Sequence, residues 1–136
     1  MSNDPNNPCL FCRPEKKADW LIAENELAML WADSNAVSEG HCLALPQRHV
    51  GDFFELTPEE LLAINELLQQ RRAELLQKDP TIDGFNVGIN VGKAAGQSIF
   101  HVHVHLIPRR FGDHPNPQGG VRHVIHGKGH YPQPKK

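Results

Sequence analysis

Three histidines alternate with aliphatic residues in the segment 96–109, GQSIFHVHVHLIPR. Successive side chains of an extended backbone point to opposite faces, so His101, His103 and His105 would share one face and the aliphatic residues the other. The pattern therefore predicts a β-strand that packs one apolar face on a core and turns a row of imidazoles toward a polar partner. Near neutral pH, imidazole can transfer a proton, attack as a nucleophile or bind a metal ion.

The residues alone favour catalysis or metal binding at this row but do not choose between them. A single histidine could simply face water on an edge strand, whereas three in register make that interpretation weaker. Upstream, Gly96, Gln97 and Ser98 supply flexible backbone and a hydroxyl group suited to phosphate oxygens. Pro108 cannot donate a ladder hydrogen bond, which predicts the end of the strand or an unpaired edge there.

Four further strands should position the histidine segment. The segments WLIAEN (20–25), LAMLWADS (27–34) and HCLALPQRH (41–49) have strand-like patterns separated by turn residues, which suggests an antiparallel meander. GFNVGINVG (84–92) reads as a fourth strand and the histidine segment as the fifth. The predicted fold class is α+β: a five-stranded antiparallel sheet (a meander), a long helix after the third strand, and a short N-terminal element.

The long helix has the clearest local signals in the chain. Thr57 is a good N-cap, Pro58 suits the first helical position, and Glu60 completes a capping box. The helix is expected to span residues 58–78 and to end before the Asp-Pro pair that follows. Its apolar stripe is predicted to comprise Leu61, Ile64, Leu68 and Leu75.

Composition limits the protein to one domain of ordinary size. The 136 residues carry a formal net charge of −2 with both signs mixed along the chain, which gives no footprint for nucleic acid or a membrane surface. No apolar run approaches membrane-spanning length, and the start MSNDPNNP resembles neither a secretory signal nor a transit peptide, so we expect a cytoplasmic protein. We expect a folded domain over 1–113 and an irregular tail, rich in Gly, Pro and His, over 114–136.

The three cysteines raise a separate question about metal. Cys9 and Cys12 form a Cys-x-x-Cys pair, which in a reducing compartment suggests a metal before a disulfide. Such a pair is half of a zinc site, and spacing alone leaves two buried thiols equally open. Cys42 is expected to be a small buried hydrophobic residue.

The segment HVHVHLI resembles the signature of the histidine triad family, in which three histidines alternate with apolar residues. CLFC near the start, DSNAVSEGHCLALPQRH before the helix, GFNVGINVGKAAGQSIFH before the histidines and PRRFGD after them resemble the same family. The resemblance extends from Cys9 to about Asp113. The PRRFGD continuation is similar to the fragile histidine triad branch, which cleaves dinucleoside polyphosphates, rather than to the branch that cleaves nucleoside phosphoramidates.

The resemblance implies a hydrolase or transferase that acts at the α-phosphate of a purine nucleotide conjugate through a covalent nucleotidyl-histidine. It makes His103 the nucleophile and gives phosphate or leaving-group contacts to His105, Gln97 and Ser98. Asp33 would bind the ribose hydroxyls and Asn90 would lie beside the phosphates, although by themselves these two residues would be read as turn formers. An apolar base pocket is expected from Phe11, Leu30 and Trp31, with Trp31 better suited to the core.

The resemblance also implies a metal site and a partner. Some similar bacterial proteins hold a structural zinc on four residues, here Cys9, Cys12, His49 and His101, and Mg²⁺ is a further expectation with the substrate. Family members form homodimers through the long helix and the fourth strand, and Leu62, Leu67 and Leu76 widen the apolar surface of this helix. The alternatives are a nucleoside phosphoramidase and a non-enzymatic module that binds or senses nucleotides. No nucleic acid or membrane partner is expected.

Overall fold

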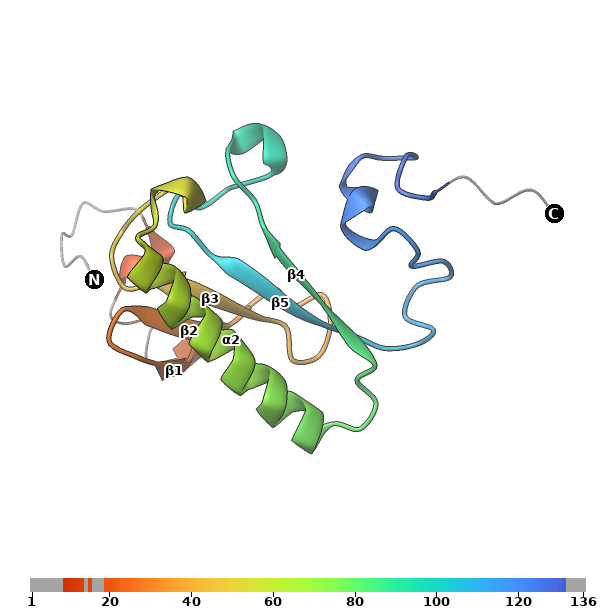
Figure 1. Cartoon of the computed structure of the whole chain (residues 1–136), viewed down its shortest axis with the longest axis horizontal. Coiled ribbons are helices and arrows are strands. Elements are labelled where there is room, and N and C mark those ends of the chain that lie inside the picture. Colours follow the sequence, from red (N-terminus) through yellow and green to blue (C-terminus); the bar gives the residue numbers. More distant parts are fainter. Residues whose placement is uncertain (1–8, 14, 16–18, 132–136) are drawn as a thin grey trace.

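The computed structural model describes residues 9–13, 15 and 19–131 of the chain. Five antiparallel strands form one sheet in the order β1-β2-β3-β5-β4, and one long helix, α2, crosses it (Figure 1). The strands are β1 (Leu21–Glu24), β2 (Ala28–Ala32), β3 (Cys42–Pro46), β4 (Gly84–Ile89) and β5 (Val104–Arg109). A short 3₁₀ helix, η1 (Leu10–Cys12), precedes them.

The strand order departs from a simple meander at its last step. β1, β2 and β3 are neighbours in chain order, but β4 lies at the outer edge and β5 fills the position between β3 and β4. Because α2 carries the chain across the sheet, the chain re-enters one position beyond β3 and then returns as β5. The histidine strand is therefore an interior strand for most of its length.

The histidine strand begins later than its sequence pattern predicts. β5 starts at Val104, and only His105 of the three histidines lies within it. The amide of Val102 donates to the carbonyl of Val50, 2.8 Å away in the loop after β3, instead of joining the sheet. The alternation still holds, since Val102, Val104 and Leu106 are all buried in the core beneath the sheet.

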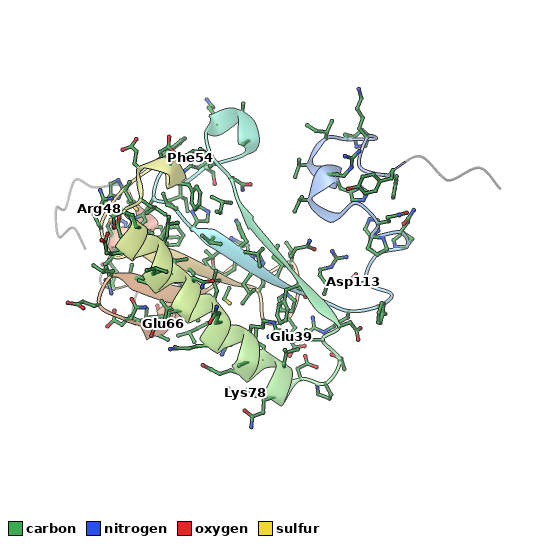
Figure 2. The ribbon with its side chains drawn as sticks, in the orientation of Figure 1. Glu39, Arg48, Phe54, Glu66, Lys78 and Asp113 are labelled. Carbon is green, nitrogen blue, oxygen red and sulfur yellow. The ribbon has the colours of Figure 1, made fainter. Side chains whose placement is uncertain are left out.

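The helix α2 spans Pro58–Lys78, as the sequence predicts. Thr57 and Glu60 form the capping box, and the charged residues Glu66 and Lys78 lie on the exposed side (Figure 2). The predicted stripe is wrong at one position: Leu61 is 40% exposed, while Leu67 is 2% exposed and belongs to the core. Because α2 is rich in leucine, its sequence is compatible with two adjacent apolar faces. Packing against β2 and β3 determines which of these faces is buried.

The sheet has a core on each face. The face toward α2 packs residues such as Leu30, Ala44 and Val104 against Ile64 and Leu67 of the helix. The opposite face packs Met29, Trp31, Leu43 and Leu45 against Phe11 and the two cysteines of the N-terminal element. Leu30 was expected in a base pocket, but its side chain faces α2. Side chains alternate along β2, and Met29 and Trp31 on either side of Leu30 point to the opposite face.

The start of α2 is tied to the loop that carries His49. Arg48 donates to both carboxylate oxygens of Glu60, from Nη2 at 2.8 Å and from Nε at 3.1 Å. The same carboxylate accepts from the amide of Thr57 at 2.9 Å. Glu60 is only 4% exposed, and the hydrogen bonds from Arg48 lower its pKa. This partly buried contact holds Arg48, the residue next to His49, in place.

Beyond Asp113 the chain is irregular apart from a 3₁₀ helix, η4 (Gly120–Val124), which lies beside β4 (Figure 1). In the part of the chain that the structure describes, no helix has the length and hydrophobicity needed to cross a bilayer.

Candidate active site

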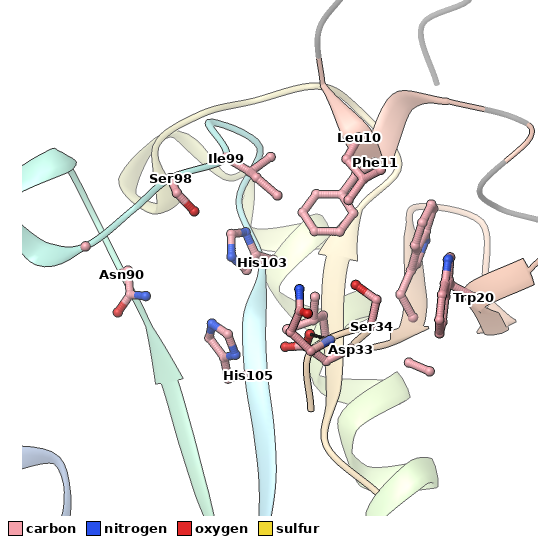
Figure 3. A pocket seen from close by; sticks show the side chains of 15 residues that line it. Leu10, Phe11, Trp20, Asp33, Ser34, Asn90, Ser98, Ile99, His103 and His105 are labelled. Carbon is pink, nitrogen blue, oxygen red and sulfur yellow. Dashed lines mark hydrogen bonds between the residues drawn. The ribbon is translucent and has the colours of Figure 1, made fainter. Parts of the chain in front are cut away.

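A cavity of about 450 Å³ opens on the sheet face opposite α2, and the histidine row forms part of its wall (Figure 3). His103 and His105 lie in the middle, with Asn90 on one side and Asp33 on the other. The apolar part of the lining comprises Leu10, Phe11, Trp20, Trp31, Leu43 and Ile99. Trp20 lies beyond Asp33, whereas Ile99 lies near Ser98 and above His103 (Figure 3). The cavity therefore combines an apolar end with a polar end that carries two imidazoles.

His103 is held in one orientation by a hydrogen bond to a backbone carbonyl two residues earlier in the chain. Its Nδ1 lies 2.9 Å from the carbonyl oxygen of His101. A carbonyl can only accept, so Nδ1 carries the proton and Nε2 keeps its lone pair. The ring of Phe11 also packs against it, with centroids 5.2 Å apart. The side chain is thus set up as a nucleophile or base at Nε2.

His105 is oriented by a chain of hydrogen bonds that begins at a backbone amide. The amide of Val37 donates to Nδ1 of His41 at 3.1 Å, which leaves the His41 proton on Nε2. That Nε2 lies 2.9 Å from Nδ1 of His105 and 3.2 Å from a carboxylate oxygen of Asp33. His41 therefore donates to His105, and the proton of His105 sits on Nε2.

Both histidines of this chain of hydrogen bonds stay neutral at neutral pH. Burial lowers the pKa of His41, although the nearby Asp33 opposes this shift. Burial, together with His103 and His41, lowers the pKa of His105 to about 4. Two nitrogens on one tetrahedral zinc would be roughly 3.3 Å apart, so the 2.9 Å contact fits a hydrogen bond better than a shared metal.

Asp33 divides its two carboxylate oxygens between a turn and the cavity. One oxygen accepts from the amide of Asn35 at 2.8 Å, as expected of a turn former. The other lies beside His41. Its side chain is 16% exposed and lines the cavity. The turn and ligand interpretations of Asp33 are therefore compatible.

Ser98 and Gln97, which were expected to act together, lie in different surroundings. Ser98 lines the cavity. Gln97 does not line it: its amide oxygen accepts from Gly92 at 2.8 Å, and its amide nitrogen donates to the carbonyls of Gly51 at 2.8 Å and Ile99 at 3.2 Å. All three bonds hold the loop that carries Ser98. In this structure Gln97 shapes the loop rather than facing the phosphate position.

A second cluster lies behind the histidine row. The ligand atoms of Cys9, Cys12, His49 and His101 all lie within 4.8 Å of one another. Nδ1 of His101 is 3.4 Å from the sulfur of Cys9 and 3.6 Å from that of Cys12, and Nδ1 of His49 is 3.2 Å from the sulfur of Cys12. Sulfur and nitrogen ligands of a tetrahedral zinc would be about 3.5 Å apart, so the donor set and its spacing fit zinc.

The remaining contacts of this cluster also suit a metal site. Nε2 of His101 lies 2.8 Å from the carbonyl of Pro46, which fixes the tautomer and leaves Nδ1 for a ligand. His101 is fully buried, and its burial lowers its pKa to about 4. Burial and the neighbouring Cys12 raise the pKa of Cys9 to about 11. A cation would reverse this rise, because thiolates are its ligands.

Comparison with known proteins agrees with this arrangement. The family model described as the HIT domain matches residues 13–112. The chain belongs to the histidine triad (HIT) family. The match does not include Cys9, Cys12 or the tail after residue 112.

Three proteins that are similar to this HIT chain differ in their described activities or bound metal. A zinc-bound histidine triad family protein from Mycobacterium smegmatis has a TM-score of 0.68 and 33% identity, covering 78% of each chain. The adenylylsulfatase HINT3 of Arabidopsis thaliana is 32% identical over 80% of this chain and 56% of its own length. A diadenosine triphosphate hydrolase of Plasmodium falciparum has a TM-score of 0.61 and 27% identity, covering 68% of this chain and 63% of that one.

Sequence reasoning about the HIT chain committed no role to two contributors to the site. His41 was not assigned a role, although its place two residues before Leu43 puts both on one face, and Leu43 pairs with His105. Trp20 lines the apolar end of the cavity, and no local pattern indicated it. Trp31 does line the cavity, and its indole nitrogen has no hydrogen-bond partner among the described residues.

Proposed function

We propose that this HIT chain cleaves a purine nucleotide conjugate at its α-phosphate through a covalent intermediate on Nε2 of His103. The observation that carries the proposal is the bond from Nδ1 of His103 to the carbonyl of His101, which leaves Nε2 free to attack. Covalent catalysis divides one difficult displacement into two easier ones. A neutral imidazole held in this tautomer needs no proton removed before it reacts.

The two steps balance as follows. Nε2 of His103 forms a bond to the α-phosphorus while the bond from phosphorus to the leaving group breaks, and the leaving group takes that electron pair. Water then attacks the same phosphorus, the P–N bond breaks, and its electron pair returns to Nε2. The water loses one proton to solvent. The attacking and leaving atoms lie roughly in line in such a transfer.

His105 and Ser98 are proposed to stabilise charge on the phosphoryl oxygens. His105 would donate from Nε2, because Nδ1 is occupied by the proton of His41. Preorganised donors of this kind are commonly worth about 3 kcal/mol each in the transition state. Asn90 would assist from the end of β4, and Asp33 would bind the ribose with the oxygen that its turn does not use. We propose only a loop-holding role for Gln97.

We further propose a dinucleoside polyphosphate as the preferred substrate. The diadenosine triphosphate hydrolase among the similar structures supports this choice, while the adenylylsulfatase supports a smaller leaving group. Mg²⁺ is expected to accompany the polyphosphate and to neutralise part of its charge.

The substrate is tested by comparing kcat/KM for diadenosine tri- and tetraphosphate, adenosine phosphoramidate and adenylyl sulfate. The highest value is expected for a diadenosine polyphosphate. A tenfold preference for the phosphoramidate would point to the phosphoramidase alternative. Tight nucleotide binding with no turnover of any of the four would point to a sensing module.

We propose that Cys9, Cys12, His49 and His101 hold a structural zinc. The zinc-bound Mycobacterium smegmatis relative and the spacing of the four donor atoms support this assignment. A site with four protein ligands leaves no open position for chemistry. The zinc would fix His101, and through its carbonyl the orientation of His103. This use of a cysteine pair also suits a reducing compartment, so we propose a cytoplasmic location.

We also propose a homodimer in which the outer strand β4 and the helix α2 face a second copy. β4 forms one edge of the sheet, and a buried edge would avoid unwanted pairing. On α2, Leu61, Leu62 and Leu76 are exposed at 40%, 70% and 37%. A symmetric interface would cover these side chains.

A further inference from the structure

A second cavity of about 420 Å³ lies next to the first. It begins at His105, on the side that faces away from the apolar end lined by Phe11 and Trp31. His105 and Asn90 line both cavities, whereas His103 lines only the first. The two spaces therefore meet at the residues proposed to surround the phosphate. A group that leaves phosphorus in the direction away from His103 would pass His105 and Asn90 into the second cavity.

The second cavity is mainly apolar. Ile107 contributes from β5, Val37 from the loop before β3, and Val121 and Val124 from η4 in the tail. The two tail valines are 61% and 82% exposed, so they present apolar surface with little protein against it. A cavity of this size lined mainly by apolar groups is typical of sites for small organic molecules.

The tail that forms this wall is held together by contacts among its own residues. Arg122 donates from Nε to the carbonyl of Gly129 at 3.1 Å, and its guanidinium lies 4.2 Å from the centre of the Tyr131 ring. His130 contacts the carbonyl of Asn116 at 3.1 Å. From residue 114 onward the sequence contains no Asp or Glu. A polyphosphate would therefore meet no carboxylate from the tail.

Gly88 forms part of the floor of the second cavity. It lies directly opposite His105 in the β4–β5 register. A Cβ atom added to Gly88 would meet nothing within 4 Å, and the residue does not need the left-handed conformation that favours glycine. Its missing side chain thus leaves open space next to His105.

We propose that the second cavity is the subsite for the leaving group and that it receives the base of the second nucleoside of a dinucleoside polyphosphate. The inference rests on the proposed function and deepens it. The first nucleoside occupies the end lined by Phe11 and Trp31, the α-phosphate lies at His103 and His105, and the remaining phosphates cross Asn90. The second base then packs on Ile107 and against the valines of η4.

Two variants test the subsite from opposite walls. Gly88→Leu fills the floor, and the double change Val121→Ser with Val124→Ser removes the apolar tail wall at a distance from the histidines. The measured quantity is the ratio of kcat/KM for diadenosine tetraphosphate to kcat/KM for adenosine phosphoramidate, whose leaving group has no base. Each variant is expected to lower this ratio about tenfold, through KM of the dinucleotide.

Gly84→Leu is the matched control. Gly84 lies on the same strand and the same face, opposite Arg109, and a Cβ there also meets nothing within 4 Å. It lies outside the second cavity, so the ratio should stay within about twofold of the parent. If the Val121 and Val124 double variant keeps the parent ratio, the subsite is refuted even if Gly88→Leu disturbs His105.

Kinetics of the parent enzyme with both substrates distinguish failure of the subsite from failure of the proposed function. Turnover of both substrates with a lower KM for diadenosine tetraphosphate supports the subsite, and an equal or higher KM contradicts it alone. Turnover of none of the four nucleotides that test the proposed function refutes that function, and the subsite falls with it.

Discussion

Nε2 of His41 lies 2.9 Å from Nδ1 of His105, although the two residues are 64 positions apart in the chain. The proton of His41 sits on Nε2 because its Nδ1 accepts from the amide of Val37. His105 therefore has its own proton on the nitrogen that faces the phosphate position. We treat His41 as a positioning residue: it acts through His105 and is not assigned a contact with substrate.

Replacing His41 should lower kcat more than it weakens nucleotide binding. His41→Leu leaves Nδ1 of His105 without a donor and is expected to reduce kcat by about 10–100-fold, which is less than the roughly 10²–10⁴-fold that a group transferring a proton itself contributes. His41→Gln can still donate from its amide and should keep more activity. In His41→Leu the neutral form of His105 loses a stabilising hydrogen bond, so the pKa of His105, followed by NMR titration of its imidazole, should rise. Equal kcat losses in the two variants with no rise in this pKa would contradict the role.

Stability should decrease as pH falls from about 7 toward 4. His41 and His105 have folded-state pKa values below their ordinary value of 6.5, so the unfolded chain binds more protons in this window. Their contribution is complete above the unfolded pKa and is lost as pH falls toward the folded one. One such proton changes the free energy of unfolding by at most about 1.4 kcal/mol per pH unit. Urea unfolding at several pH values should give a shallower slope for His105→Asn than for the parent, and an identical slope would contradict the assignment.

Protein purified without chelator or nickel should contain about one zinc per chain. Cys9→Ala should lose the metal and lower Tm by on the order of 10 °C, with a smaller effect on turnover per folded molecule. Cys42→Ala is the matched control, because Cys42 is buried in the other core and lies outside the cluster. Metal analysis and thermal unfolding measure both effects. A zinc-free parent whose Cys9 and Cys12 react freely with a thiol reagent would leave only the buried-thiol interpretation.

Light scattering at micromolar concentration should give twice the chain mass of 15.3 kDa. Leu62→Glu should shift the protein toward the monomer, since this side chain is 70% exposed on α2. Leu27→Glu, at the turn before β2 on the opposite edge of the sheet, should leave the dimer intact. Leu67, once a candidate for the interface, is buried in the core, so Leu67→Glu would test folding instead. A parent mass near that of one chain would refute the dimer.

The sequence predicted the fold best where a feature depends only on residues close together in the chain. Thr57, Pro58 and Glu60 fixed the start of α2, and the Asp-Pro pair fixed its end. The alternation of the histidine segment correctly predicted which side chains enter the core. The strand order was not predictable in this way, because it depends on where the chain re-enters the sheet after a long helix.

The site shows the same limit. Spacing and family resemblance indicated five site residues, and the structure places all of them around one cavity: Asp33, Asn90, Ser98, His103 and His105. They did not indicate that Gln97 turns inward to bind three backbone groups, since this depends on the path of a glycine-containing loop. Nor did they reveal the contact between His41 and His105, which exists only because β3 and β5 are neighbours.

The central claim is a covalent bond between the α-phosphorus and Nε2 of His103. Rapid acid-free quenching of the parent with diadenosine tetraphosphate, followed by peptide mass analysis, should find an adenylyl group on His103 and on no other residue. His103→Ala should form no adduct and lose at least about 10³-fold in kcat while still binding nucleotide, because its change leaves the core face of the segment untouched. An adenylyl group on another histidine, or a His103→Ala variant within tenfold of the parent activity, would contradict the account.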